Sequence, residues 1–399
     1  MGRNIMKPIS KKVMTGLFAG AMGLSIFAPA SQAATPEKNS YYTINLKADQ
    51  RIVWDVYKGW QSDDAGIKLW NGDRGDNEQF VFFPLDEGAY AIVNKNSGKP
   101  VALNDGNASY WTDGVRNFPL WGQTEALRQK NWTGASNEQW YLRDKGNNNF
   151  EIVNQGNGKV ASWGGMSVTG GYLDYVDLDE SNPSDNNRLF NIPAARSTFS
   201  LPNVPAVGTR PNAPAYDPNG PIDQQLSQTS ESVVVGSALM PCIMVKDNGA
   251  SDYTKIHNSP YYVLVKEEYW EKAFSDIVPA GGKRIYTVRN GVTTVDQQKM
   301  TETMNMSFGA DLGLKFGEQS LGLKYEISKS LQTEISKTTT ESNESGIEKT
   351  TPSADGKDTG FTEYQLVTKY TLKRTDGSAV STPWTVKDAK QTVLRTIAK

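Results

Sequence analysis

The chain alternates apolar and polar residues without interruption from residue 304 to residue 316. After a turn over residues 317–320, the alternation resumes and continues to residue 328. A period of two places successive side chains on opposite faces of a β-strand, so the pattern predicts a long hairpin. Its apolar face consists of Met304, Met306, Phe308, Ala310, Leu312, Leu314, Phe316, Leu321, Leu323, Tyr325 and Ile327.

The second arm of this hairpin allows another interpretation. Leu323, Ile327, Leu331 and Ile335 also recur at every fourth position, as on an amphipathic helix. We prefer a strand, because the first arm needs a partner. A strand that crosses a membrane needs about 9–11 residues, apolar toward lipid and polar toward the lumen. The hairpin is therefore long enough to insert, although an ordinary half-buried sheet would show the same alternation.

The first half of the chain contains three copies of one pattern. Each copy opens with an aromatic residue two positions before an isoleucine and closes with an amide-rich turn followed by an aromatic residue. The openings are at Tyr42, Tyr90 and Phe150, and the closings are at Phe80, Trp140 and Phe190. Units of this size cannot bury a core alone, but three units packed around a threefold axis can.

These repeats resemble the ricin-B-type β-trefoil lectins. In that family an Asp and an Asn bind vicinal sugar hydroxyls, and an aromatic ring packs on the apolar face of the sugar. The resemblance implies a carbohydrate site at Asp55, Trp70 and Asn77 and a second one at Asn104, Trp121 and Asn137. The third repeat has Trp163 and Gly164 at the acid position, so we expect no site there. The same residues could instead serve as core aromatics and turn caps.

The chain divides into four segments. Residues 1–33 read as a secretory signal peptide, with a basic start, an apolar run and small residues before a cleavage site after Ala33. We therefore expect a secreted protein. Residues 34–196 form the lectin-like domain, and residues 197–222 form a proline-rich linker open to proteolysis. Residues 223–399 form a second β-rich domain, with one short helix expected at 266–274.

Composition removes most catalytic chemistry. The net charge is -2, which gives no reason to expect a nucleic-acid partner. His257 and Cys242 are the only residues of their types, and no zinc or phosphate-binding motif is present. We expect no enzyme activity, no metal and no cofactor. A carbohydrate-active enzyme that uses a pair of carboxylates remains an alternative hypothesis.

The second domain resembles the insecticidal crystal toxins of the binary-toxin type. The resemblance rests on the residues at 216–220, 240–245, 260–264 and 269–270. It implies an all-β chain, with an N-terminal β-trefoil followed by an elongated antiparallel, aerolysin-like domain. It also implies that the head binds a glycan or glycoprotein receptor on the cell surface and that the chain forms homo-oligomers. A hairpin near residues 304–335 then inserts into the host-cell membrane.

Two points remain open at this stage. Some members of that family need a second toxin component and others act alone. The alternative function is therefore a secreted lectin, or the receptor-binding component of a two-protein toxin, without pore activity of its own. Many members also accumulate as intracellular crystals without a signal peptide, so the predicted signal leaves crystal formation in question.

Overall fold

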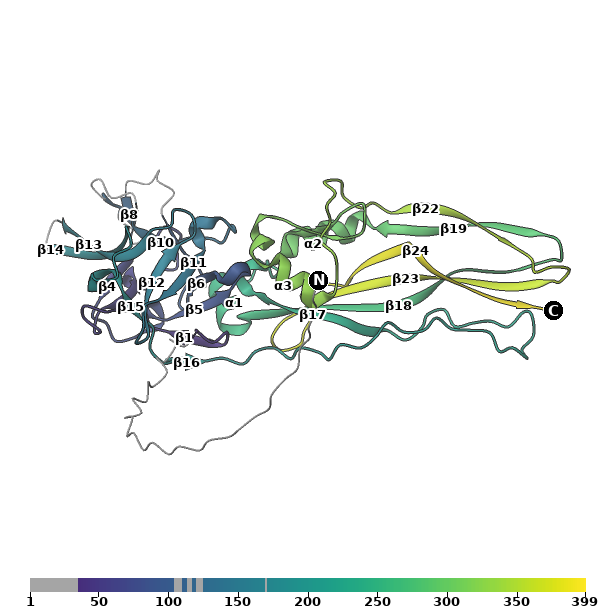
Figure 1. Cartoon of the computed structure of the whole chain (residues 1–399), viewed down its shortest axis with the longest axis horizontal. Coiled ribbons are helices and arrows are strands. Elements are labelled where there is room, and N and C mark those ends of the chain that lie inside the picture. Colours follow the sequence, from purple (N-terminus) through teal and green to yellow (C-terminus); the bar gives the residue numbers. More distant parts are fainter. Residues whose placement is uncertain (1–34, 104–109, 113–116, 120–124, 169–170) are drawn as a thin grey trace, which may run out of the picture.

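The computed structural model describes residues 35–103, 110–112, 117–119, 125–168 and 171–399. The predicted signal peptide, Asn104 and Trp121 lie outside these ranges. The molecule is elongated, with a head of short strands at one end and a long sheet that runs to the other end (Figure 1). Three helices lie between these two parts in the same view.

The head is built from short strands whose apolar positions point inward. Phe80, Trp140 and Phe190 are each fully buried. They follow the 3-10 turns η2 (Asp76–Glu78), η4 (Ser136–Glu138) and η5 (Asn186–Arg188), which recur once in each repeat. The repeat pattern therefore marks one common element of a threefold structure, as the sequence predicts for a trefoil. The head strands are β1 (Ser40–Tyr42), β2 (Asn45–Leu46), β3 (Val53–Val56), β4 (Ile67–Trp70), β5 (Phe80–Pro84), β6 (Tyr90–Asn94), β7 (Val101–Leu103), β8 (Tyr110–Thr112), β9 (Asn117–Pro119), β10 (Leu127–Gln129), β11 (Trp140–Asp144), β12 (Asn149–Asn154), β13 (Val160–Val168), β14 (Gly171–Asp179), β15 (Phe190–Asn191) and β16 (Ser197–Thr198).

The tail is a six-stranded antiparallel sheet in the order β17-β18-β23-β24-β19-β22. The strand β18 pairs along most of its length with β23, so it is an interior strand of the sheet. The short helix expected at 266–274 is therefore wrong, because these residues lie within β18. The apolar run at 242–245 forms the 3-10 turn η6 (Cys242–Met244) rather than a strand. The tail strands are β17 (Val233–Pro241), β18 (Tyr261–Val278), β19 (Lys283–Val292), β22 (Ser345–Pro352), β23 (Thr359–Lys373) and β24 (Trp384–Ala398).

The residues between β19 and β22 form a folded insert, which we define as residues 293–344. Its elements are α2 (Thr294–Met304), β20 (Met306–Phe308), β21 (Leu314–Phe316), η7 (Glu318–Leu323) and α3 (Lys324–Leu331). The predicted single strand over 304–316 is wrong for this form, because it folds back on itself as the small hairpin β20–β21. The predicted second arm is also wrong here, since the helical alternative holds for α3. Among the described residues, no helix is long and apolar enough to cross a membrane.

The proline-rich segment runs as an extended strap along the tail. Arg210 forms an ion pair with Glu268, with 2.6 Å between Nε and Oε2. The indole Nε1 of Trp270 donates a hydrogen bond of 2.8 Å to the carbonyl of Pro211. Prolines keep the strap extended, but they lack the backbone N–H that pairing inside a sheet requires. The contacts of the strap with the tail are therefore made largely by side chains.

The head and the tail share one hydrophobic core. Tyr41, Phe83 and Trp132 of the head belong to the same buried cluster as Tyr261 of the tail and Met304 of the insert. The hydroxyl of Tyr41 also donates a hydrogen bond of 3.0 Å to the carbonyl of Ile256 in α1 (Asp252–Asn258). The insert therefore lies where the two larger parts meet.

Candidate functional site

The structure brings together the three residues predicted for the first carbohydrate site. Asp55 lies on β3 and Trp70 on the neighbouring strand β4, where Val53 pairs with Trp70 and Asp55 pairs with Lys68. The side-chain amide of Asn77 donates a hydrogen bond of 3.1 Å to Oδ2 of Asp55. Trp70 is 53% exposed, so most of its ring is available to a ligand.

Lys68 is a member of this site that sequence reasoning missed. Its Nζ lies 3.8 Å from Oδ1 of Asp55 and 3.8 Å from the centroid of the Trp70 ring. The period-two pattern of β4 could have found it, because residues 68 and 70 share one face of the strand. A cation over one face of the indole stabilises the position of the ring, and the opposite face is left for a sugar to pack on.

Burial decides the electrostatics of the site. Asp55 is 3% exposed, and this burial raises the pKa of its carboxyl group well above the usual range. The positive charge of Lys68 opposes that rise. Burial also lowers the pKa of Lys68, and the charge of Asp55 opposes this change in turn. Oδ1 of Asp55 is buried without a hydrogen-bond partner, and Nζ of Lys68 lies 3.8 Å from it.

Glu78 supports the floor of the site. Its carboxylate accepts a hydrogen bond of 2.5 Å from the backbone amide of Arg74. A Cβ at Gly72 would lie 1.5 Å from Oε1 of Glu78, so only glycine leaves room for this carboxylate. Asp55, Lys68, Trp70, Asn77 and Glu78 line one pocket together with Lys58, Asn71, Gly72 and Asp73.

The register of the head explains why the repeats differ. Val53 pairs with Asn45, Pro100 with Val93, and Val160 with Val153, at the same point of each repeat. Counting two residues onward from Val53, Pro100 and Val160 puts Asp55, Ala102 and Ser162 at one equivalent position. The second and third repeats therefore lack the acid at this position, and Asn104 lies beyond it.

In the second and third repeats, the described residues that correspond to the site form hydrogen bonds to other groups of the head. Asn137 donates a hydrogen bond of 3.3 Å to the carbonyl of Leu103, much as Asn77 approaches the carbonyl of Val56 at 3.5 Å. In the third repeat, the indole of Trp163 donates a hydrogen bond of 2.9 Å to Asp174. Among the described residues, the complete set of acid, aromatic ring and amide occurs in the first repeat.

The apolar residues of the predicted hairpin are largely buried in the insert. Met304, Met306, Phe308, Leu314 and Leu323 are each no more than 5% exposed and belong to the shared core. Leu312 and Phe316 pack against the edge of that core, Ala310 is exposed, and Leu321 and Tyr325 are 44% and 61% exposed. Most of the stripe expected to face lipid is thus buried in this form in the core that the insert shares with the head and the tail sheet, whereas Ala310, Leu321 and Tyr325 remain exposed.

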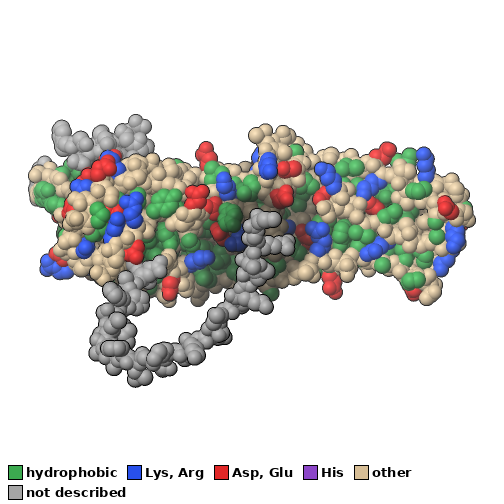
Figure 2. All heavy atoms as spheres, viewed as in Figure 1, with side chains coloured by type: hydrophobic (Ala, Val, Ile, Leu, Met, Phe, Trp, Pro, Cys, Tyr) green, Lys and Arg blue, Asp and Glu red, His purple; other side chains and the backbone are tan. Residues whose placement is uncertain are grey.

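Metal-ligating and titratable side chains also occur outside this site, in the part of the chain that the structure describes. There, no group of three or more His, Cys, Asp or Glu side chains is placed to hold a metal ion. His257 contacts the carbonyl of Tyr253 and lies 3.8 Å from Asp76. Acidic and basic side chains are interspersed over the visible face of the molecule (Figure 2).

Comparisons with known proteins agree with this architecture. Residues 233–399 match the family described as Insecticidal Crystal Toxin, P42, and residues 32–116 and 76–173 match the Ricin-type beta-trefoil lectin domain-like family. The crystal structure of Cry35Ab1 superposes with a TM-score of 0.74 at 21% identity and covers 90% of each chain. That likeness confirms the predicted fold of a trefoil head followed by an elongated antiparallel tail.

Curated relatives cover most of the chain. Binary larvicide subunit BinB of Lysinibacillus sphaericus is 33% identical over 328 residues, which are 79% of this chain and 69% of that protein. Binary larvicide subunit BinA of the same organism is 26% identical over 322 residues, which are 80% and 81% of the two chains. Insecticidal crystal protein Cry35Ab1 of Bacillus thuringiensis is 27% identical over 287 residues, or 69% and 68%. These matches confirm the resemblance found in the sequence and support a role as a toxin protein: the chain belongs to the insecticidal binary-toxin family.

Proposed function

We propose that this chain is a secreted insecticidal pore-forming toxin. Its head binds a cell-surface glycan through Asp55, Trp70 and Asn77, and its insert refolds into a hairpin of an oligomeric membrane pore. The observation that carries the proposal is the pairing of the two strands that flank the insert.

The strands β19 and β22 pair antiparallel, from Lys283 opposite Pro352 to Asn290 opposite Ser345. If this pairing continued through the insert, Met304 would lie opposite Leu331. The turn would then consist of Gly317 and Glu318, at the point where the alternation in the sequence breaks. A two-residue turn with glycine first is a favoured hairpin connection.

The continued register also brings the two apolar stripes together. It places Phe308 opposite Ile327, Leu312 opposite Leu323, and Leu314 opposite Leu321. The opposite face would be polar, with an Asp and a Lys as direct partners at residues 311 and 324. A register shifted by one residue would place apolar side chains opposite polar ones.

The extended arms have the dimensions that a membrane strand needs. Residues 304–316 and 319–331 each exceed the roughly 9–11 residues that cross a bilayer as a tilted strand. Lys329 is the one charged residue in the apolar stripe, near its end, where a lysine can extend its amine toward the headgroups. Closing several such hairpins into a barrel would satisfy their backbone hydrogen bonds, which open strands in lipid cannot do.

The glycan site supplies the means of attachment. An exposed indole, a carboxyl group and an amide next to it are the groups that recognise a sugar ring and its hydroxyls. The match to a family of lectin-like trefoils supports the same assignment. Because BinA and BinB are named as subunits of a binary larvicide, a second toxin component is a natural partner for this chain as well.

Dye release tests the proposal. The full chain would be added to dye-loaded liposomes and to insect midgut membrane vesicles, before and after treatment with trypsin. We expect release from the midgut vesicles. Release in the absence of a second toxin protein would make the chain a single-component toxin. Binding to the vesicles with no release under either condition would contradict the stand-alone pore. The chain would then be a lectin or the receptor-binding half of a two-protein toxin.

A further inference from the structure

The head touches the insert at the residues that would form the tip and second arm of the proposed hairpin. The indole Nε1 of Trp132 donates a hydrogen bond of 2.7 Å to the carbonyl of Gln319. Two residues later, a Cβ on Gly134 would lie 2.1 Å from the carbonyl oxygen of Glu318. Gly134 has φ of +85°, so this turn needs glycine both for its conformation and for the close approach.

A second contact concerns the start of the helix α3. Leu323 stands at the N-cap position and offers no side-chain hydrogen bond to the first turn. Asp86, in the 3-10 turn η3 (Asp86–Gly88) of the head, accepts a hydrogen bond of 3.3 Å from the backbone amide of Tyr325. Tyr325 is the second helical residue, which is where an N-cap side chain normally binds. The head thus provides the cap, and its negative charge also lies at the positive end of the helix dipole.

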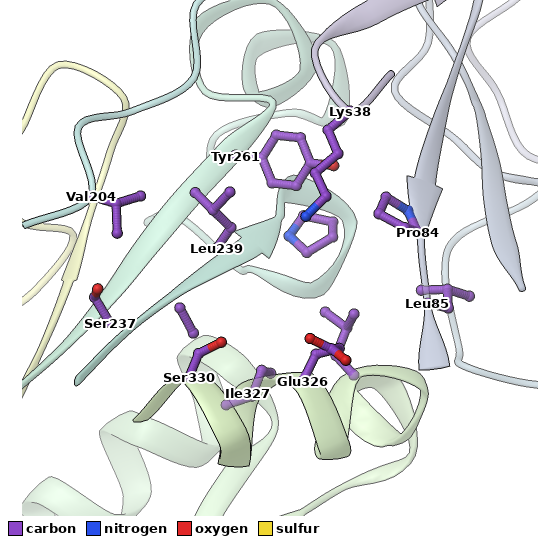
Figure 3. A pocket seen from close by; sticks show the side chains of 13 residues that line it. Lys38, Pro84, Leu85, Val204, Ser237, Leu239, Tyr261, Glu326, Ile327 and Ser330 are labelled. Atoms are coloured by element: carbon purple, nitrogen blue, oxygen red, sulfur yellow. The ribbon is translucent and has the colours of Figure 1, made fainter. Parts of the chain in front are cut away.

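The helix needs this support because its other packing is incomplete. Its inner side chains Ile327 and Leu331 are buried, but a cavity of about 420 Å³ remains beside it. Figure 3 shows this cavity, with Ile327, Glu326 and Ser330 of α3 on one side and Leu239 and Tyr261 of the tail on another. Pro84 and Leu85 of the head, just before Asp86, line it too. A helix of this length is marginal in water without tertiary contacts.

We propose that the head acts as a latch, which holds the insert in its helical form through Asp86 and Trp132 and releases it when the head is displaced. This inference rests on the proposed function and adds its regulation. In the hairpin register, residues 323–331 are a strand, so the Asp86 cap is available to the closed form alone. Displacement of the head and refolding of the insert would then be coupled, because both break the contacts of Asp86 and Trp132 with the insert.

Hydrogen–deuterium exchange on the full chain tests the latch without requiring a pore. The variants are Asp86→Ala, Trp132→Phe and the control Glu87→Ala. The control removes the same charge from the next residue of the same turn, and Glu87 is exposed. We expect amides of residues 325–331 to exchange about fivefold faster in Asp86→Ala, since an N-cap stabilises a helix to that extent. Exchange in Glu87→Ala should match the wild type, and exchange in β23 should be unchanged in all variants.

The second variant guards against misfolding. Trp132→Phe keeps a ring in the core but removes the donor to Gln319, so we expect faster exchange around residues 317–320. Unchanged exchange of α3 in Asp86→Ala and of residues 317–320 in Trp132→Phe would overturn the latch. Dye release is measured separately on the same proteins. Faster exchange with no release from any of them would leave the latch standing and contradict the pore.

Discussion

The substitution Leu312→Asp separates the closed form of the insert from the inserted form. In the closed form, Leu312 is partly buried and has φ of +64°, a left-handed conformation that Asp adopts more readily than Leu. We therefore expect the soluble fold to lose about 1 kcal/mol or less. In the proposed inserted hairpin, residue 312 would lie near the middle of its arm on the lipid-facing side, where a carboxylate costs about 2–3 kcal/mol.

That penalty recurs in every protomer of the pore. Two copies alone cost about 5 kcal/mol, which lowers the equilibrium population of the inserted state by more than about a thousandfold. The assay is dye release from liposomes, with thermal unfolding as the check on folding. Lys315→Asp is the matched control, because it adds a carboxylate to the polar face and should still release dye. Equal release by wild type and Leu312→Asp would refute the assignment of residue 312 to the lipid face.

Three further predictions concern the head and its junction with the tail. Trp70→Ala should abolish glycan binding, measured by calorimetry. Trp163→Ala, which removes another exposed indole, in the third repeat, should retain it. Since burial raises the pKa of Asp55 to about 8, the folded chain keeps a proton that the unfolded chain loses at about pH 4. The contribution of Asp55 to stability therefore falls between about pH 4 and 8, and the Tm of Asp55→Asn relative to wild type should rise over that interval; a constant difference would contradict this. Gly98→Ala should cost about 2–4 kcal/mol in a denaturant titration, because its Cβ would lie 2.3 Å from a backbone oxygen of α1 at φ of +71°. Gly88 has φ of +77° with open space around it, so Gly88→Ala should cost only about 1 kcal/mol. Equal costs for the two substitutions would show that the residues facing Gly98 can move to accommodate a Cβ.

The repeats of the head and the long strands of the tail could be predicted from the sequence because both arise from local periodicity. Phe80, Trp140 and Phe190 recur after similar turns, which indicates three units packed around a threefold axis. The resemblance to the ricin-B-type lectins then implies a trefoil. The interior position of β18 could not be seen in this way. Both of its edges pair with neighbouring strands, and its aromatic residues at 269 and 270 lie on opposite faces, as successive residues of a strand do.

The insert shows where a local pattern stops being decisive. Its sequence satisfies a period of two and, from Leu323 to Leu331, a spacing of four as well. The helix prevails in the closed form because the shared core accepts Ile327 and Leu331, and because Asp86 of the head caps the helix. These contacts join residues more than 200 positions apart in sequence, so no local pattern could reveal them. Lys68 joins the candidate glycan site through its place on β4, two residues before Trp70, rather than through a motif.

We propose that the insert refolds into a hairpin in the register set by β19 and β22. Cysteine cross-linking in membranes tests it most directly, in a background where the buried free thiol of Cys242 is replaced by alanine. In that register, residues 307 and 328 face each other on the polar side, within reach of an aqueous oxidant. The pair Ser307→Cys with Ser328→Cys should form an intramolecular disulfide efficiently once vesicles are bound. The pair Ser307→Cys with Ser330→Cys, which lies diagonally across the strands, should form little. Efficient cross-linking of the diagonal pair, or of neither pair in vesicles that have released their dye, would contradict the account.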